Sequence, residues 1–133
     1  MRNVATKNGP VSVYVNVDDV AVTFGPREGS PLPYQVNGVA YEGTVYMRRN
    51  VQGMWHLSDE FVRRVEDWTR GTTDAAWKVM FATAETLADE FYTPENVKQA
   101  KRESLESKIE SVEREIARLE NDLAQLKNDL RSL

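Results

Sequence analysis

Nine apolar residues recur at alternating spacings of four and three positions over residues 105–133. They are Leu105, Ile109, Val112, Ile116, Leu119, Leu123, Leu126, Leu130 and Leu133. Because an α-helix turns once in about 3.6 residues, this spacing places all nine side chains on one narrow stripe. Such a stripe is typical of a coiled-coil seam, which a single helix leaves in contact with water. The sequence therefore predicts that the C-terminal segment self-associates.

A clear helix start precedes the stripe. Thr93-Pro94 is typical of one, because threonine caps a helix and proline fits its first position. We therefore expect one helix over residues 94–133. The coiled coil is expected to begin only at about residue 103, since the stripe extended backward meets the polar residues Arg102 and Lys98.

The stripe could instead pack on a helix of the same chain. Only Tyr92-Thr93 separates the two last helices, a loop too short to reverse the chain comfortably, so a second copy is favoured. Ile109 and Ile116 occupy the a positions of the heptad repeat, and the d positions hold mainly leucine. This combination favours a parallel homodimer. The flanking charges favour the parallel order over the antiparallel one only slightly, because each exposed pair contributes a few tenths of a kcal/mol.

The composition excludes several classes of protein. With 133 residues, of which 41% are hydrophobic, the chain has the length of about one domain and is too apolar for disorder. It has no cysteine, which rules out disulfides, thiolate metal sites and a cysteine nucleophile. Its net charge of −4 disfavours a phosphate-binding surface. No apolar run matches a signal peptide or a membrane helix, so we expect a cytoplasmic protein with no membrane partner.

Residues 11–24 have the alternation of a β-hairpin. Four valines from Val11 to Val17 occupy every second position, and the apolar residues from Val20 to Phe24 do the same. With Asp18-Asp19 as a two-residue loop, all these apolar side chains share one face. The predicted pairs are then Val17 with Val20, Val15 with Val22 and Val13 with Phe24.

Asn37-Gly38 predicts a second hairpin, between residues 34–36 and 39–41, because both residues accept the positive φ angles of a type I′ turn. Residues 44–48 are expected to extend this sheet, and residues 50–53 to form a further turn. The segment 25–33 contains three prolines and two glycines, which predicts an irregular loop. This loop and the 50–53 turn are the surfaces that we expect to contact a partner.

Two helices are expected between the sheet and the C-terminal helix. Ser58 is suitable as the N-cap of the first, which ends at Gly71. Thr72 or Thr73 caps the second, over residues 74–91. The apolar face of this second helix is broad, which suits packing on a sheet. The face comprises Trp77, Met80, Phe81, Ala84, Leu87, Ala88 and Phe91.

The predicted architecture is α+β. A small antiparallel β-sheet made of hairpins packs with two helices and is followed by a long C-terminal coiled-coil helix. Residues 1–93 form the globular head, and residues 94–133 form the C-terminal helix.

No residue pattern indicates an enzyme. His56 is the only histidine, and no nucleophile or metal-ligand pattern accompanies it. Asp18-Asp19 is explained by a turn, and the carboxylate pairs of the helices are expected to face solvent. We therefore expect no catalytic, cofactor-binding or metal-binding residue and no small-molecule substrate.

The expected function is binding without catalysis. The coil dimerises the chain, and the head binds another protein, with Arg27, Arg48, Arg49 and Trp55 as candidate contacts. Size and layout, rather than any motif, suit an accessory protein of a bacterium or phage that modulates a host factor or acts as a scaffold. The alternative is a dimeric nucleic-acid-binding regulator that combines arginine doublets with aromatic stacking. Residues 74–91 disfavour this alternative, because they lack the basic face of a recognition helix.

Overall fold

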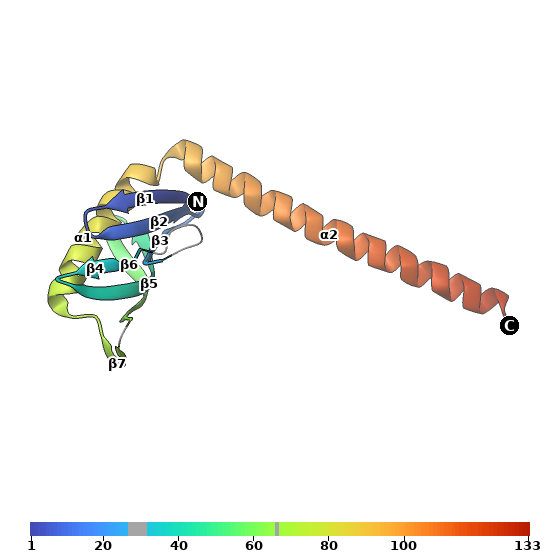
Figure 1. The fold of residues 1–133 in the computed structure, drawn as a ribbon. Helices are drawn as coiled ribbons and strands as arrows, with labels where there is room; N and C mark the ends of the chain where they lie inside the picture. Colours follow the sequence, from blue (N-terminus) through green and yellow to red (C-terminus); the bar gives the residue numbers. More distant parts are fainter. Residues whose placement is uncertain (27–31, 66) are drawn as a thin grey trace. The chain divides into compact units, whose positions relative to one another are not determined.

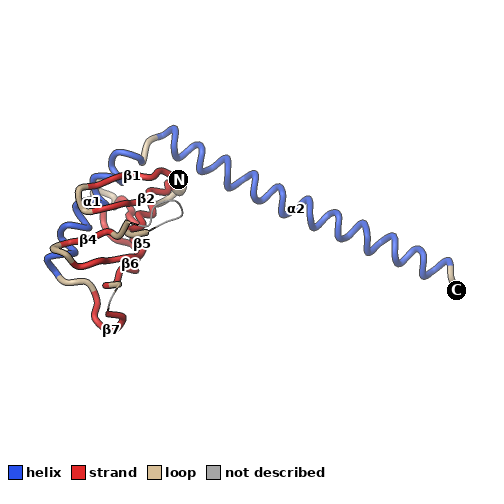
Figure 2. Tube along the Cα trace, in the orientation of Figure 1, coloured by secondary structure: helices blue, strands red, loops and turns tan. Residues whose placement is uncertain are grey.

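A computed structural model describes residues 1–26, 32–65 and 67–133. The chain divides into two units, Met1–Lys98 and Gln99–Leu133. The first unit contains a seven-stranded antiparallel sheet and the helix α1, and the second consists of most of the helix α2 (Figures 1 and 2). The predicted α+β class is therefore confirmed, with a sheet that is followed by two helices.

The strands follow one another mostly as hairpins. The sheet order is β1-β2-β3-β5-β6-β7, and β4 pairs with the first residues of β5. Every pairing is antiparallel. The elements are β1 (Arg2–Thr6), β2 (Gly9–Val15), β3 (Val20–Phe24), β4 (Tyr34–Val36), β5 (Val39–Arg49), β6 (Trp55–Arg64), β7 (Asp67–Gly71), α1 (Asp74–Phe91) and α2 (Pro94–Arg131).

The β2–β3 hairpin forms where it was predicted, but the predicted register is wrong by two residues. Val15, rather than Val17, pairs with Val20. The loop is longer because the Asn16 amide donates to the Asp19 carbonyl oxygen (2.9 Å), closing a four-residue connection. Aspartate is poorly suited to the positive φ angles of a two-residue turn, which favours the wider loop. A shift of two residues leaves the side chains within both strands on their predicted faces, whereas Val17 lies in the connection.

The Asn37-Gly38 hairpin is confirmed. Asn37 has a φ of 51° and Gly38 a φ of 78°, as a type I′ turn requires. Tyr34 pairs with Tyr41, and both side chains are buried. The strand β5 then continues to Arg49, as the sequence predicts. The turn after it is also confirmed, because the Asn50 side-chain oxygen accepts bonds from the amides of residues 52 and 54.

The helix predicted from Ser58 to Gly71 is wrong, because this segment forms β6 and β7. Ser58 caps no helix, and its hydroxyl donates to the Tyr46 carbonyl oxygen instead (3.1 Å). The long strand β5 has a free edge that β6 pairs along most of its length, and this tertiary pairing overrides the local helical spacing. A register shift at Tyr46/Met47 also interrupts the period of two that would have marked a strand. Of the two helices predicted to pack with the sheet, only the second one, α1, is present.

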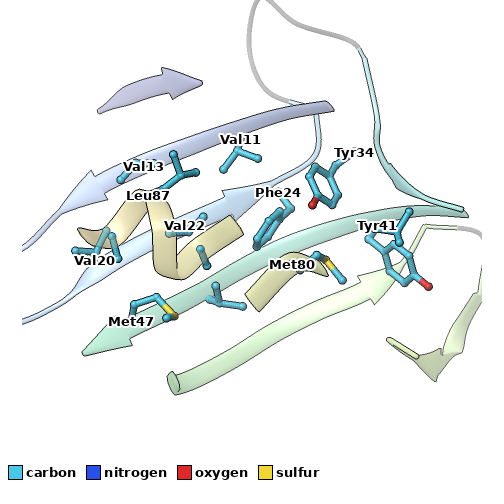
Figure 3. Packing of buried hydrophobic residues seen from close by; sticks show 14 of the residues in the cluster. Val11, Val13, Val20, Val22, Phe24, Tyr34, Tyr41, Met47, Met80 and Leu87 are labelled. Atoms are coloured by element: carbon cyan, nitrogen blue, oxygen red, sulfur yellow. The ribbon is translucent and has the colours of Figure 1, made fainter. Parts of the chain in front are cut away.

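The helix α1 occupies the predicted residues. The Thr73 hydroxyl accepts a hydrogen bond from the Ala76 amide (3.3 Å), which confirms one of the two predicted caps. Figure 3 shows Leu87 of α1 near Val13 and Val22, and Met80 of α1 nearer to Phe24, all within one core cluster. Of the predicted apolar face, four residues are buried and Trp77, Phe81 and Phe91 are half-buried. The buried ones are Met80, Ala84, Leu87 and Ala88.

The start of α2 is also as predicted. The Thr93 hydroxyl accepts a hydrogen bond from the Asn96 amide (3.2 Å), and the Asn96 side chain donates to the Phe91 carbonyl oxygen (2.7 Å). These bonds satisfy backbone groups at the end of one helix and the start of the next. The helix then runs for 38 residues to Arg131, and none of its residues is buried.

Candidate functional site

The first candidate surface is the apolar stripe of α2. The helix is continuous from Leu105 to Leu130, so its 4-3 spacing places eight of the nine predicted side chains along one side. Leu133 lies beyond the end of the helix at Arg131. All nine are exposed, from 50% at Ile116 to 100% at Leu133. A helix of this length with no buried residue gains no packing energy within its own unit, Gln99–Leu133.

Polar side chains beside the stripe pair along the helix. Arg118 forms ion pairs with Glu115 and with Asp122, three residues before it and four after it. Gln125 donates to Asp129 at 2.9 Å. Pairs with these spacings stabilise an isolated helix by about 0.2–0.5 kcal/mol each. They support the helix but do not cover the apolar stripe.

The second candidate surface is a group of four side chains, Arg49, Trp55, Asp89 and Tyr92, which we name the hairpin–helix cluster. Arg49 ends β5 and Trp55 begins β6, and the two residues pair across the hairpin. The Arg49 guanidinium carbon lies 4.7 Å from the centre of the Trp55 ring, and its Nη2 atom lies 2.8 Å from the Asp89 carboxylate. The cluster therefore joins the hairpin to α1.

The aromatic residues complete this cluster. The Trp55 and Tyr92 rings meet edge to face, with centroids 5.4 Å apart. The Trp55 indole N–H faces the same Asp89 oxygen at 3.4 Å, and the Tyr92 hydroxyl donates to the Val17 carbonyl oxygen at 2.8 Å. Two of the four predicted partner contacts, Arg49 and Trp55, are thus held by one carboxylate and one tyrosine.

A hollow of about 390 Å³ lies beside the hairpin–helix cluster, and we name it the hairpin–helix hollow. Its walls come from the tip of the β5–β6 hairpin and from the exposed side of α1. Among the described residues, Glu85 forms no ion pair, whereas Asp89 is paired with Arg49. The residues that line the hollow are Gly53, Met54, Trp55, Glu85, Thr86 and Asp89.

The remaining predicted contacts lie elsewhere. Arg48 is exposed at the end of β5, and it points to the opposite side of the strand from Arg49 because neighbouring side chains alternate. It pairs in register with His56, which is also exposed. Arg27 and most of the predicted 25–33 loop fall outside the described residues.

Sequence reasoning missed the carboxylates of this site. Asp89 was expected on a solvent-facing position of its helix, and it is 70% exposed, yet it holds both Arg49 and Trp55. The contact spans 40 residues of sequence, and no local spacing signals it. The breadth of the predicted apolar face of α1 indicates only that this helix packs on the sheet.

The described part of the chain also has a hollow of about 400 Å³ that is lined by Ala5, Thr6, Ala82, Thr83, Thr86 and Leu87. It contains no group of three or more histidine, aspartate and glutamate side chains that could hold a metal ion. None of its helices is long and apolar enough to cross a membrane. No family model, no curated protein and no solved structure matches the chain.

Proposed function

We propose that the protein is a homodimer built by a parallel coiled coil of α2, and that its two heads bind another protein. The observation that carries the proposal is the stripe of eight exposed apolar side chains, from Leu105 to Leu130, on one uninterrupted helix. At 1.5 Å per residue this stripe extends for about 38 Å. Exposed apolar side chains in a continuous row of this length are characteristic of an association surface.

The energy of the stripe favours association. Full burial of a leucine or isoleucine side chain contributes about 1.5–3 kcal/mol. Because the side chains of the stripe are about half exposed, burying the exposed half would contribute about half of this energy at each position. Summed over the eight helical positions in each of two chains, this gain is about 12–24 kcal/mol. The cost of bringing two molecules together is about 4–15 kcal/mol, so the balance favours association over most of these ranges. Two heads on one dimer would then bind a multivalent partner with avidity.

The head supports protein binding more than nucleic-acid binding. The two arginine doublets before α1 are Arg48-Arg49 and Arg63-Arg64. One arginine of each doublet is paired with a carboxylate, because Arg49 pairs with Asp89 and Arg63 pairs with Glu42 at 2.7 Å. A phosphate-binding surface needs several arginines or lysines that face solvent together. The alternative of a nucleic-acid-binding regulator is therefore not favoured.

Paired lysine substitutions test the association directly. Ile116→Lys with Leu123→Lys places charges on the stripe, whereas Ala117→Lys with Ala124→Lys adds the same charges one position away. Light scattering after gel filtration is expected to give about twice the chain mass of 15.2 kDa for the wild type and the alanine-site control. The stripe variant is expected to be monomeric. Equal masses for the two double variants would contradict the proposal.

A further inference from the structure

We propose that the hairpin–helix hollow receives a basic side chain of the protein partner, flanked in that partner by apolar residues. The inference deepens the proposed function and rests only on its second part, the binding of a protein by the head. It does not depend on the coiled coil, because every lining residue belongs to the unit Met1–Lys98.

The shape of the hollow suits a long side chain. Its volume of about 390 Å³ is at the lower end of the range for ligand sites, and it accommodates a lysine or arginine rather than a large cofactor. Met54 and Trp55 supply apolar surface for the aliphatic stem of such a side chain. Glu85 and Asp89 place carboxylates at the same hollow.

The charge of the hollow selects a cation. Asp89 is balanced by Arg49, whereas Glu85 forms no ion pair among the described residues. An apolar ligand that covered Glu85 would remove water from an ionised carboxylate without compensation, which is costly. A phosphate group would be repelled. A lysine or arginine side chain would provide the missing partner.

The protein itself shows that this arrangement holds a guanidinium. Arg49 lies 4.7 Å from the centre of the Trp55 ring and 2.8 Å from Asp89. Cation–π contact combined with a carboxylate is a recurrent way of binding such groups. Trp55 and Asp89 also line the hollow, but Arg49 already contacts both of them. The carboxylate that an incoming cation would pair with is therefore Glu85, beside this existing arginine site.

The hairpin tip supplies the apolar part of the surface. Val51 is 97% exposed and Met54 is 66% exposed, and both stand on the short connection between β5 and β6. Methionine adapts its shape to different partners, which suits a contact surface. Residues that flank the basic side chain in the partner are therefore expected to be apolar.

Two blocked tripeptides test this inference on the full chain. The probe is acetyl-Leu-Lys-Leu-amide, and its matched control is acetyl-Leu-Gln-Leu-amide. The readout is the NMR signal of the Trp55 indole N–H, one of three tryptophans in the chain. The lysine peptide is expected to shift this signal with an affinity at least fivefold higher than that of the glutamine peptide.

Substitutions on α1 complete the test. Glu85→Gln is expected to lower the affinity for the lysine peptide at least fivefold. Glu90→Gln, which removes an exposed carboxylate outside the hollow, is expected to leave it within twofold. The inference is overturned by equal affinities for the two peptides, by an unchanged affinity of Glu85→Gln, or by no shift at 10 mM peptide. A shift caused by oligothymidylate but not by the lysine peptide also overturns it.

The same titration separates the two parts of the proposed function. The monomeric Ile116→Lys, Leu123→Lys variant is expected to bind the lysine peptide as the wild type does. Peptide binding by a wild-type protein that is monomeric would overturn the coiled coil alone. A dimeric wild type that gives no indole shift would overturn the hollow alone.

Discussion

Replacing Asp89 by alanine separates the two forces that hold the hairpin–helix cluster together, charge and aromatic packing. Asp89 accepts from Arg49 at 2.8 Å, but the two side chains are 70% and 41% exposed. An ion pair this exposed contributes about 0.5 kcal/mol to stability. The indole bond to the same carboxylate is long, at 3.4 Å, and adds little. Asp89→Ala is therefore expected to lower the free energy of unfolding by about 0.5–1 kcal/mol.

Trp55→Ala is expected to cost more, because it removes packing as well as polar contacts. The Trp55 ring is half-buried, packs against the core and meets the Tyr92 ring edge to face at 5.4 Å. An aromatic pair of this kind contributes about 0.5–1.5 kcal/mol beyond its buried area. With the lost burial of part of the indole, the total is about 2–3 kcal/mol.

Urea unfolding of the full chain measures both losses. All variants are compared at one protein concentration, because self-association would make the transition concentration-dependent. Glu90→Ala, an exposed position on α1 with no ion pair among the described residues, is the control and is expected to change the free energy by less than about 0.5 kcal/mol. In 0.5 M salt most of the Asp89→Ala loss should disappear. A loss above 2 kcal/mol for Asp89→Ala, or one equal to that of Trp55→Ala, would refute this reasoning.

Three further experiments test the sheet, the core and the coil. Gly43→Ala is expected to destabilise the fold by about 3 kcal/mol or more in thermal unfolding, because φ is +141° and a Cβ atom would overlap the Phe61 carbonyl oxygen. Gly53→Ala is the control, and it should cost only about 1 kcal/mol because φ is +79° and no atom lies near the added Cβ. Burial raises the pKa of Tyr34, because the folded protein favours the neutral phenol over the charged phenolate. The contribution of this burial to the free energy of unfolding is therefore fully present below the ordinary pKa of 10.0, and it is lost as the pH rises above that value. Tyr34→Phe should therefore lose less stability than the wild type between pH 9 and pH 11 in urea unfolding, and an equal loss would contradict this assignment. Leu130→Cys, in a chain without cysteine, should form a disulfide-linked dimer on mild oxidation if the coil is parallel, whereas a product that stays monomeric on a non-reducing gel would contradict that order.

The sequence predicted those turns and helix caps whose hydrogen bonds join residues close together in the chain. The Asn37-Gly38 turn and the Thr73 and Thr93 caps each act within a few residues, and all three lie where they were predicted. The faces of β2 and β3 were also correct, since a register shift of two residues preserves them. The loop length and the pairing register were wrong, because both depend on the bonds of Asn16 with Asp19.

Elements that depend on distant partners were not predicted. The strand β6 exists because it pairs with β5, and its irregular register hid the alternation that would have identified it. The strand β1 has a short and mostly exposed sequence, so no buried face marked it. The candidate site follows the same rule. Arg49 and Trp55 were predicted as candidate partner contacts near a turn. Their contacts with Asp89 could not be predicted, because they form only when β5, β6 and α1 come together in the folded chain.

The mass of the wild-type protein in solution tests the central claim most directly. If the stripe of α2 is covered by that of a second copy, sedimentation equilibrium between 1 and 50 μM is expected to give a single species of about twice 15.2 kDa. The Ile116→Lys, Leu123→Lys variant should sediment at the mass of one chain over the same range. A wild-type mass of 15.2 kDa at 50 μM would contradict the coiled coil.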